Sequence, residues 1–510
     1  DGTLFPYTTL FRSFGYVLPE VVLVATACAL FLLAPFQRSA TQTPASGVRH
    51  GCGGLSLLAL GFAAWLWLHG PPLEPVDGLW SGPFRGDQLA WFVRGLTLMT
   101  GGVLVLISWN QFAAEEAGES HACLLLILAG VNLTAAANDL VGLFLALELV
   151  SIPTYILLYL LCRTSAGQEA TLKYFLLSIF SSAVLLYGFS FLYGAAGTTN
   201  LEAIRQGLVN SAAAPLPVIL AVALIAVVAG IGFRVTAVPF HFYAPDVFQG
   251  THAAGAAMLS IVPKLAGFTV LLRLIAILPA PSSAPGPGIA LSEILAPALW
   301  WLAVITMCFG NVLALWQTNV RRMLAYSSIA HAGYMLVGLT IAQSQGGLAG
   351  GVESLLFYLA VYGFMTVGAF AVLISLGGPD RQIDQLDELA GLGRLRPATA
   401  LLLAVFLFSL TGLPPTAGFF AKFNLLVAAW SAGTAASQAI AVIMAVNAAI
   451  GAGYYLRIVA AMYLRPAGGE PPVPSTDLLA LVGGLLCAAV TLALFFAPQW
   501  LWDLVSQIAA

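Results

Sequence analysis

The sequence predicts an all-α polytopic membrane protein, and three observations support that fold class. Of the 510 residues, 60% are hydrophobic and 8% are charged, whereas a soluble domain carries about 25% charged residues. The mean hydropathy is +0.93, so the chain is expected to fold with lipid as its solvent. Its apolar runs last about 20 residues without strict alternation, which favours helices over the strands of a closed barrel.

Hydropathy predicts about fourteen transmembrane helices, each close to the ~20 residues that cross a bilayer. The expected spans are 15–36, 51–69, 87–109, 120–136, 140–162, 169–194, 215–240, 254–278, 292–317, 321–342, 350–376, 398–428, 436–464 and 475–496. Residues 1–13 lack the apolar core of a signal peptide and do not resemble the rest of the chain. We therefore expect residues 1–13 to be foreign to the natural protein.

The arginines predict how the chain is oriented in the membrane. Counted from the first span, the odd-numbered loops hold Arg38, Arg49, Arg163, Arg321, Arg322, Arg381, Arg394, Arg396 and Arg465. The even-numbered loops hold little beyond Arg85 and Arg205. Because positive charge concentrates in cytoplasmic loops, the odd loops are expected to be cytoplasmic and both termini to face the other side.

Two apolar segments interrupted by glycine and proline predict an internal repeat. GIGFRVTAVPFHFY surrounds Pro239, and SLTGLPPTAGFFAKF surrounds Pro414 and Pro415, about 175 residues later. Broken helices at corresponding positions are typical of inverted repeats in transporters. The expected division is 14–119 for peripheral helices 1–3, 120–278 for a first five-helix unit (helices 4–8), 292–464 for an inverted second unit (helices 9–13), and 475–510 for peripheral helix 14 and the C-terminus.

Composition and motifs argue against nucleic acid, metal and a redox cofactor in this chain. The net charge is −3 and the sequence has no basic cluster for nucleic acid. The cysteines are scattered and none forms a CxxC pair, which disfavours an iron–sulfur or zinc site. They are Cys28, Cys52, Cys123, Cys162, Cys308 and Cys487. His241, Asp246 and His252 match no helical metal motif.

Three charged residues lie deep inside apolar stretches, where each costs about 2.5–3.5 kcal/mol even on a lenient insertion scale. They are Glu148, Lys264 and Lys422. Ionisable residues at membrane depth beside broken helices indicate ion or proton movement. The alternatives are a carboxyl paired only for packing at Glu148 and a snorkelling side chain at Lys264. Lys422 is interpreted as the counterpart of Lys264 in the second repeat and as the terminal site.

Two further residues surround the first predicted helix break. Arg234 precedes Pro239 by about a turn and a half and is expected on the same helix. An arginine stays charged in a protein, so Arg234 is suited to modulate Glu148 electrostatically and not to carry a proton. His241, just past the break, is a candidate proton relay; the alternative is that it satisfies the broken backbone.

Two more residues are candidates for moving protons. His331, near Ser327, Ser328 and Tyr334, is a candidate relay between the two buried lysines, with a hydrogen-bonded core histidine as the alternative. Lys173 lies close to a predicted cytoplasmic loop, where it is either a residue that takes up protons or an interfacial anchor.

These motifs resemble the antiporter-like membrane subunits of respiratory complex I, the bacterial NADH–quinone oxidoreductase, and among them subunit N. The resemblance covers nearly the whole chain from about Phe14. The segments that carry it are PEVVLVATACALFLL, LFLALELVSIPTYILLYL, KYFLLSIFSSAVLLYG, AVPFHFYAPDVFQG, NVRRMLAYSSIAHAGYMLVGL and LTGLPPTAGFFAKF. Lysine at position 422, where subunit M has glutamate, favours subunit N.

The resemblance implies a fourteen-helix fold with two inverted five-helix repeats and a proton route along a central polar axis. Glu148 and Arg234 match the family's glutamate–lysine pair, Lys264 its central lysine and Lys422 its terminal lysine. Arg234 departs from the family pattern, which usually has lysine at that position.

The function implied by the resemblance is that of a proton-translocating subunit in the bacterial inner membrane. Electron transfer would then occur in partner subunits, which would hold the FMN, the iron–sulfur clusters and the quinone. Expected partners are neighbouring antiporter-like and small membrane subunits and a lateral helix of another subunit. The alternatives are a subunit of a multi-subunit Na⁺/H⁺ antiporter, a subunit of a membrane-bound hydrogenase, and a structural membrane subunit that does not pump.

Overall fold

The computed structural model describes residues 15–39, 45–70, 82–210, 218–278, 291–344, 350–377, 381–466 and 477–509. The expectation that residues 1–13 are foreign falls outside these residues. The regular secondary structure of the described residues is helical, with only isolated β-bridges between loops. The predicted all-α fold class is therefore confirmed.

Twelve helices of the described residues are long and apolar enough to cross a membrane. They are α2 (Leu18–Ser39), α3 (Ala45–Leu68), α4 (Gln88–Ser108), α5 (Ala117–Ala136), α6 (Leu140–Leu161), α7 (Ser165–Ala196), α11 (Ala253–Ala276), α12 (Leu291–Leu315), α13 (Val320–Ser344), α14 (Gly351–Gly377), α18 (Ala435–Leu464) and α19 (Leu478–Phe496). The chain is thus a multi-pass membrane protein.

The remaining helices are shorter. Two of them, α9 (Val218–Val235) and α16 (Pro397–Thr411), begin the seventh and twelfth expected spans. The others are α8 (Leu201–Asn210), α10 (Ala244–Gly250), α15 (Leu392–Leu395), α17 (Ala417–Ser431), α20 (Pro498–Ala509) and the 3₁₀ turns η1 (Ala114–Glu116) and η2 (Leu386–Leu389). Hydropathy alone did not predict α8, α10 or α20, since each is far shorter than a membrane span.

The first helix break corrects one prediction, because Arg234 and Pro239 do not share a helix. Helix α9 ends at Val235, and Pro239 lies in the turns that lead to α10. Thr236 takes a positive φ of 61°, which a right-handed helix does not accommodate. Proline also lacks the N–H that would continue the helical hydrogen bonds.

The second break lies between α16 and α17. Gly412 ends α16 with a φ of 88°, and its N–H bonds the carbonyl oxygens of Phe408 and Ser409. The residues Pro414 and Pro415 follow at once and keep the chain from resuming the helix. Glycine at 418 then lets α17 approach α16 closely, since a Cβ there would lie 1.9 Å from the Ser409 carbonyl oxygen.

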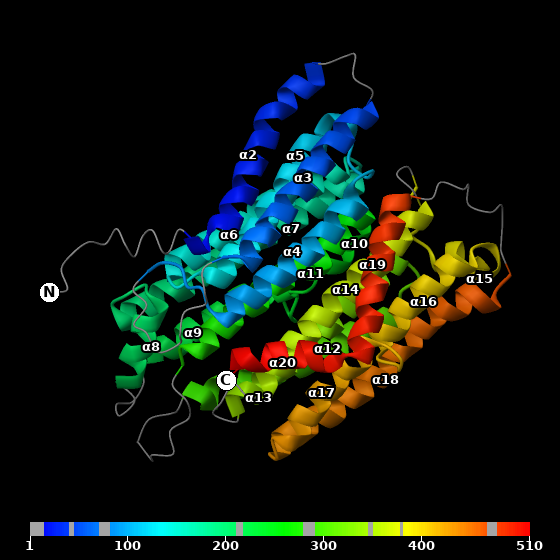
Figure 1. Ribbon diagram of the computed structural model, residues 1–510. Helices are drawn as coiled ribbons and strands as arrows, with labels where there is room; N and C mark the ends of the chain where they lie inside the picture. The colour runs from blue at the N-terminus through cyan, green and yellow to red at the C-terminus, as the bar shows by residue number, and fades with distance from the viewer. Residues whose placement is uncertain are drawn as a thin grey trace.

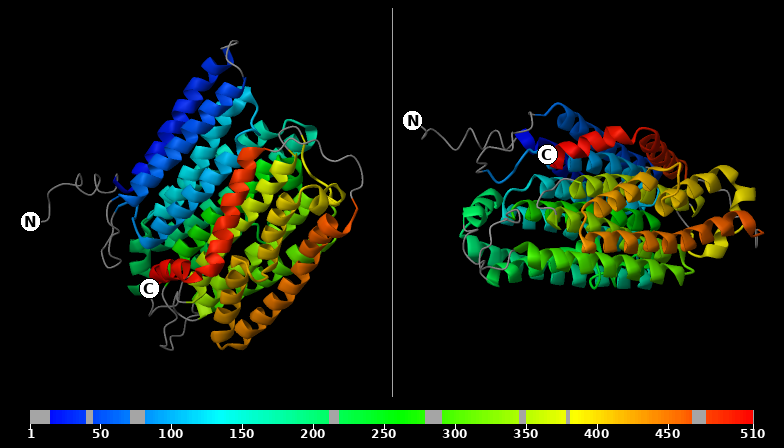
Figure 2. Two further views of the ribbon diagram at one scale, coloured as in Figure 1. Left: turned by 45° about the vertical axis from the view of Figure 1, so that its right-hand side comes forward. Right: turned by 90° about the horizontal axis from the view of Figure 1, so that it is seen from below.

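Helices α11, α13 and α14 form the centre of the bundle. The apolar stretches of α11 and α14 are wholly buried, and that of α13 is almost wholly buried. Helix α14 packs against α11, α13, α16, α17 and α19, while α2 and α18 lie at opposite sides of the bundle (Figures 1 and 2). Helix α20 turns away from α19 and lies across the bundle against α14 and α4 (Figure 1).

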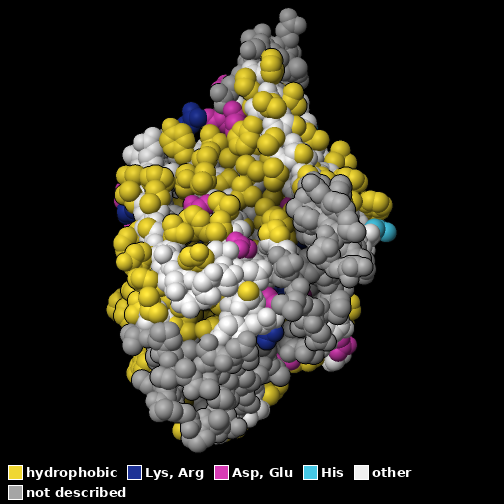
Figure 3. Space-filling model, turned by 90° about the vertical axis from the view of Figure 1, so that its left-hand side faces the viewer, with side chains coloured by type: hydrophobic (Ala, Val, Ile, Leu, Met, Phe, Trp, Pro, Cys, Tyr) yellow, Lys and Arg dark blue, Asp and Glu magenta, His cyan; other side chains and the backbone are white. Residues whose placement is uncertain are grey.

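The outer face of the bundle is largely apolar. The face in Figure 3 is dominated by hydrophobic side chains with few charges. Large apolar side chains such as Leu145, Phe180 and Trp316 are more than half exposed in the isolated chain. Such a surface fits a protein that contacts lipid or neighbouring membrane subunits.

The two expected five-helix units can be followed in the order of the helices. The first would comprise α5, α6, α7, the broken pair α9–α10, and α11, and the second α12, α13, α14, the broken pair α16–α17, and α18. In both, the broken helix is the fourth element. The inverted relation between the units stays a prediction.

Candidate functional site

Arg234 on the last turn of α9 contacts Glu148 on α6. Its Nη2 lies 3.3 Å from Oε1 of Glu148, which also accepts a 2.5 Å hydrogen bond from Oγ of Ser182 on α7. Arg234 Nη1 donates to Oγ of Ser151 at 2.7 Å and to the carbonyl oxygen of Leu147 at 3.1 Å. The Arg234 side chain is 3% exposed and that of Glu148 25% exposed. The partly buried carboxyl thus has the cationic partner that its sequence position predicts.

Close packing of small residues brings α9 to this position. A Cβ at Gly230 would lie 2.8 Å from the backbone nitrogen of Leu185, so α9 and α7 approach along their backbones. Ser181 of α7 donates a hydrogen bond to the carbonyl oxygen of Gly230 at the same contact. On α6, Glu148 and Ser151 are three residues apart and therefore face the same side.

Lys264 lies at the centre of the bundle on α11, directly after Pro263. Its side chain is fully buried and donates a hydrogen bond to Oγ of Ser328 on α13. The hydroxyl of Tyr362 on α14 donates to the same Oγ at 2.9 Å, and Lys264 Nζ is 5.6 Å from the centre of the Tyr362 ring. The snorkelling alternative is therefore wrong, because the ammonium lies between α13 and α14 and not at the membrane surface.

His331 on α13 has a hydroxyl on each side of its ring. Nδ1 lies 2.7 Å from the hydroxyl of Tyr358 on α14, and Nε2 lies 3.0 Å from the hydroxyl of Tyr455 on α18. The Tyr455 hydroxyl also contacts Oγ of Ser327. A neutral imidazole donates from one nitrogen and accepts at the other, so its two tyrosine contacts have opposite directions. These contacts satisfy the histidine and also connect three helices.

Lys422 on α17 lies against the second helix break. Its Nζ donates to the carbonyl oxygens of Leu410 and Thr411, both at 2.8 Å. These carbonyls are free because α16 ends there and its last turn has no following N–H groups to bond. Lys422 Nζ also lies 5.2 Å from the centre of the Tyr334 ring. The break therefore supplies the partners that a buried ammonium needs.

Aromatic rings connect the surroundings of the two lysines. The His331 ring is 5.1 Å from the Tyr362 ring, which lies at Lys264, and 5.7 Å from the Tyr334 ring, which lies at Lys422. We use the term central axis for Lys264, Ser328, Tyr362, His331, Tyr334 and Lys422. Within the described residues no hydrogen bond joins Arg234 to this axis. Helix α11 nevertheless packs on α9 at that point, since a Cβ at Gly267 would lie 3.3 Å from Cβ of Arg234.

The structure corrects the expected pairing of the two lysines within the units. Lys264 is on α11, the fifth helix of its unit, whereas Lys422 is on α17, the second half of a fourth helix. By order of elements, the counterpart of the helix that bears Lys422 is the broken pair α9–α10. Arg234 lies on that pair, and so Lys264 is not the counterpart of Lys422.

His241 and Lys173 lie away from the central axis. His241 is in the turns between α9 and α10, where its backbone oxygen accepts from the Ala244 N–H at 3.0 Å. Its ring is 6.3 Å from the Phe309 ring and Nδ1 has no protein partner among the described residues. Lys173 on α7 instead forms ion pairs with Glu169 at 2.7 Å and Asp246 at 2.6 Å.

Asp246 on α10 is held by two cations. Lys173 binds one carboxylate oxygen, and Arg322 of α13 binds the other at 2.6 Å. Partial burial raises the pKa of Asp246, but the hydrogen bonds and charges of Lys173 and Arg322 outweigh burial and hold that pKa below its usual range. Asp246 thus links α10 to α7 and α13.

His252, the remaining residue of the trio considered for a metal, caps a helix: its Nδ1 accepts a hydrogen bond from the Ala254 N–H at the start of α11.

Several polar residues of the candidate site, at the Glu148–Arg234 pair and along the central axis, were not predicted. They are Ser151, Ser182, Asn311, Tyr358, Tyr362 and Tyr455. The only available signal was spacing: Tyr358 and Tyr362 are four residues apart in an apolar helix and therefore share one face. Tyrosine is common enough in buried helices that this pattern alone indicates no function.

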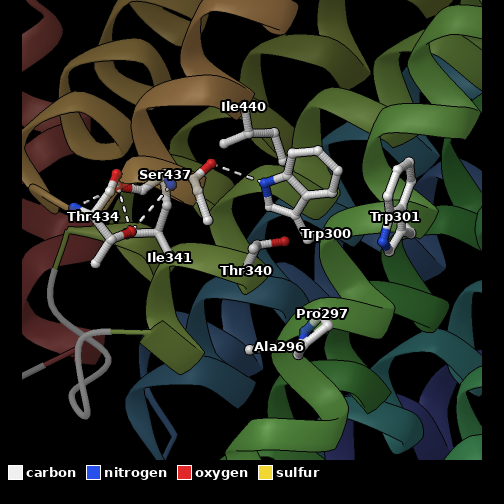
Figure 4. A pocket seen from close by; sticks show the side chains of 10 residues that line it. Ala296, Pro297, Trp300, Trp301, Thr340, Ile341, Thr434, Ser437 and Ile440 are labelled. Atoms are coloured by element: carbon white, nitrogen blue, oxygen red, sulfur yellow. Dashed lines mark hydrogen bonds between the residues drawn. The ribbon is translucent and has the colours of Figure 1, made fainter.

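A surface pocket of about 350 Å³ lies apart from the axis, between α12, α13 and α18 (Figure 4). Trp300 stands at its edge and donates to the Ala436 carbonyl oxygen at 2.9 Å. None of the residues that line the pocket belongs to the central axis. The ionisable groups of the candidate site are therefore in the packed interior of the bundle and not in this pocket.

Comparison with known proteins places the chain in a family. Residues 137–450 match the family described as NADH:quinone oxidoreductase/Mrp antiporter, TM. The chain is 38% identical over 503 residues to NADH-quinone oxidoreductase subunit N 1 of Solibacter usitatus, covering 97% of this chain and 96% of the relative. It is 37% identical to subunit N of Trichlorobacter lovleyi, covering 96% of each chain.

Solved structures agree with these relatives. A chain of respiratory complex I from Thermus thermophilus with bound Aureothin is 30% identical, with a TM-score of 0.75, covering 95% of this chain and 99% of that one. A chain of the Mrp complex from Dietzia sp. shares the fold, with a TM-score of 0.76 at 20% identity and 97% coverage of both chains. Sequence and fold together show that the chain belongs to the NADH-quinone oxidoreductase subunit N family.

Proposed function

We propose that this chain translocates protons as a membrane subunit of an NADH–quinone oxidoreductase, driven by electron transfer in partner subunits. The observation that carries the proposal is the pair of buried lysines joined by His331 and tyrosine rings. Lys264 is fully buried, and its hydrogen-bond partner is the Ser328 hydroxyl and not a carboxylate. Among the described residues, the hydrogen-bond partners of Lys422 are backbone carbonyl oxygens alone. An ammonium without a carboxylate partner can lose its proton more readily than one held in an ion pair.

Each ionisable residue has a distinct role in this proposal. Lys264 takes up and releases a proton at the centre of the bundle, and Lys422 exchanges protons with the outer side. Glu148, through its pairing with Arg234, is assigned to change the electrostatic potential at Lys264; unit charges that move to within about 4–6 Å of each other interact by about 3–4 kcal/mol at an effective dielectric of about 20. His331 relays between the lysines. Lys173 and His241 lie away from the axis. In this proposal Lys173 takes up protons before they reach the axis, and His241 relays protons outside it.

The proposed function requires partner subunits that carry out electron transfer and cover the outer helices. The FMN, iron–sulfur clusters and quinone site would belong to them, while neighbouring antiporter-like and small membrane subunits and a lateral helix would cover the apolar outer helices. The arginine distribution supports cytoplasmic odd loops, with both termini on the other side of a bacterial inner membrane. The two helix breaks support two inverted five-helix units.

The two main alternatives receive less support. A Na⁺/H⁺ antiporter subunit shares the fold, but the Mrp chain is 20% identical, whereas subunit N relatives reach 38% over nearly the full chain. A structural subunit without pumping would not need two buried lysines without carboxylate partners. Neighbouring genes for flavin and iron–sulfur subunits would favour the oxidoreductase over an antiporter or a hydrogenase.

Replacing Lys264 by alanine tests the proposal. In inside-out membrane vesicles that contain the assembled complex, NADH-driven proton pumping and quinone reduction are both expected to fall, because the central protonation step is coupled to the redox cycle. Arg465→Ala is the control, since it removes a cation from an exposed ion pair with Asp387 that contributes about 1 kcal/mol or less. If Lys264→Ala leaves both activities unchanged in an assembled complex, Lys264 is structural and the proposal fails.

Arg234 is expected to act as a fixed charge. Arg234→Lys should pump like the unaltered chain, because lysine also places a cation beside Glu148. Arg234→Gln should lose about 1.4 kcal/mol or more of that interaction, which corresponds to a rate of proton pumping about tenfold lower. The rate of NADH-driven proton pumping in vesicles measures both variants. A sharp rise in pumping for Arg234→Lys, with Arg234→Gln matching the unaltered chain, would show that proton release at this position matters.

A further inference from the structure

A buried amide network lies beside the central axis and has no role in the proposed function so far. Asn311 on α12 is 1% exposed and Asn447 on α18 is 3% exposed. Asn311 Nδ2 lies 2.8 Å from the Tyr334 hydroxyl and 3.2 Å from Oδ1 of Asn447. The Tyr454 hydroxyl donates to Oδ1 of Asn311 at 3.1 Å. The amide of Asn311 therefore joins α12, α13 and α18 at a tyrosine of the axis.

The surroundings of Asn311 determine which way its amide points. The Met307 carbonyl oxygen lies 2.9 Å from one end of the amide and can only accept a hydrogen bond. That end must therefore be the NH₂ group. The same nitrogen lies 2.8 Å from the Tyr334 hydroxyl and 3.2 Å from Oδ1 of Asn447. We assign its two hydrogens to the two shorter contacts, Met307 and Tyr334, so that the hydroxyl oxygen of Tyr334 accepts. The hydrogen of the Tyr334 hydroxyl is then directed away from Asn311.

This arrangement orients Tyr334 relative to Lys422. The ring of Tyr334 has Lys422 Nζ 5.2 Å from its centre, and its hydroxyl end is held by Asn311. The face of an aromatic ring attracts a cation, so the angle of the ring affects how well the ammonium is stabilised. A tyrosine released from Asn311 would be free to turn both its ring and its hydroxyl hydrogen.

Glycines bring the three helices close enough for these contacts. A Cβ at Gly310 would lie 2.5 Å from the backbone nitrogen of Ala330, and one at Gly333 would lie 2.5 Å from that of Met307. Helices α12 and α13 therefore touch along their backbones in the turn that precedes Asn311. On α18, a Cβ at Gly451 would lie 3.1 Å from Oδ1 of Asn311.

We propose that Asn311 is a positioning residue for the Lys422 site, acting through Tyr334, with Asn447 and Tyr454 holding its amide. The inference rests on the proposed function, because it concerns proton exchange at Lys422. It assigns a role to residues that touch neither lysine. Their effect on pumping would come from the orientation of the Tyr334 ring and hydroxyl.

A double-mutant cycle tests the inference in vesicles that contain the assembled complex. Asn311→Leu and Tyr334→Phe are each expected to lower the rate of NADH-driven proton pumping about three- to tenfold, the range for one lost hydrogen bond. If Asn311 acts through Tyr334, the double variant should lose no more than the larger single loss. Losses that multiply in the double variant, or normal pumping by Asn311→Leu, would overturn the inference.

Two controls separate this inference from general damage and from the proposed function. Asn132→Leu is the matched control, because Asn132 is equally buried on α5 and its amide has no protein partner among the described residues. It should pump normally. If Lys422→Ala abolishes pumping while Asn311→Leu pumps normally, only the inference fails. If Lys422→Ala itself pumps normally, the proposed function fails as well.

A second variant covers the case in which Asn311→Leu does not assemble. Gly451→Ala keeps the Asn311 amide but adds a methyl group 3.1 Å from its Oδ1 and 3.6 Å from the Tyr454 hydroxyl. It is expected to lower pumping in the same direction, and combining it with Tyr334→Phe should add nothing. Normal pumping by Gly451→Ala, or a loss that adds to that of Tyr334→Phe in the double variant, would overturn the inference.

Discussion

Replacing Glu148 by glutamine is expected to lower the stability of the protein by about 3 kcal/mol, at the lower end of the range for breaking a buried ion pair. The substitution leaves the Arg234 guanidinium, 3% exposed, without its counter-charge. The remaining hydrogen bonds of Arg234 to Ser151 and Leu147 keep the loss at the lower end. Removing both charges with Glu148→Gln and Arg234→Gln should restore much of the stability, because no uncompensated charge then remains.

The midpoint of thermal unfolding of the detergent-purified complex measures this effect. Glu169→Gln is the matched control, since Glu169 is 65% exposed and its ion pair with Lys173 should contribute about 1 kcal/mol or less. An equal loss in the single and double variants would mean that the Glu148 carboxyl does not compensate the Arg234 charge. The double variant should still fail to pump, because stability and charge switching are separate properties of the pair.

The positions of the ionisable groups could be predicted in part from the cost of burying charge. That argument singled out Glu148, Lys264 and Lys422, and all three lie in the bundle. It applies equally to Arg94 and Arg273, which the sequence analysis did not single out. Arg94 is buried against Glu20 at 2.6 Å, and Arg273 is paired with Asp87.

The distinction among these cations is the kind of partner, and only the fold reveals it. Arg94 and Arg273 each have a carboxylate and behave as structural ion pairs. Lys264 has a serine hydroxyl, and Lys422 has two backbone carbonyls. The side-chain partners of Lys264, Arg94 and Arg273 are 64, 74 and 186 residues away in the sequence, so no spacing rule finds them. The carbonyls at Lys422 are only 11 and 12 residues away, but they become available because the helix ends there.

The helix breaks were more predictable than the network between the lysines. Glycine and proline restrict or free the backbone at their own positions, so the segment GLPPTAG predicts a break in the helix from local sequence alone. Asn311, Tyr358 and Tyr455 gain their roles only because α12, α14 and α18 pack around α13. For a polar residue in an apolar helix, the neighbouring sequence does not predict which residue will be its hydrogen-bond partner. The short helices α8 and α20 were missed because hydropathy searches for membrane-length runs.

Gly412→Ala is expected to disable the Lys422 site, and Gly433→Ala provides a control with similar backbone strain. Both glycines have positive φ, 88° at Gly412 and 73° at Gly433, so alanine costs about 1–2 kcal/mol of conformational energy at either position. Of the two added Cβ atoms, the one at Gly412 would contact the site, because it would lie 2.9 Å from Cδ of Lys422. At Gly433 the nearest atom lies 3.9 Å away, in ordinary contact.

The two variants therefore separate strain in the backbone from displacement of the lysine. Moving Lys422 off the Leu410 and Thr411 carbonyls loses hydrogen bonds from a charged group, each worth about 1.5–3 kcal/mol. The rate of NADH-driven proton pumping should then fall about tenfold or more in Gly412→Ala, while Gly433→Ala should keep the rate of the unaltered complex. Equal losses in both variants would mean that strain at the end of a helix is enough to stop pumping. A loss confined to Gly412→Ala would instead show that the helix break acts by holding the Lys422 ammonium in place.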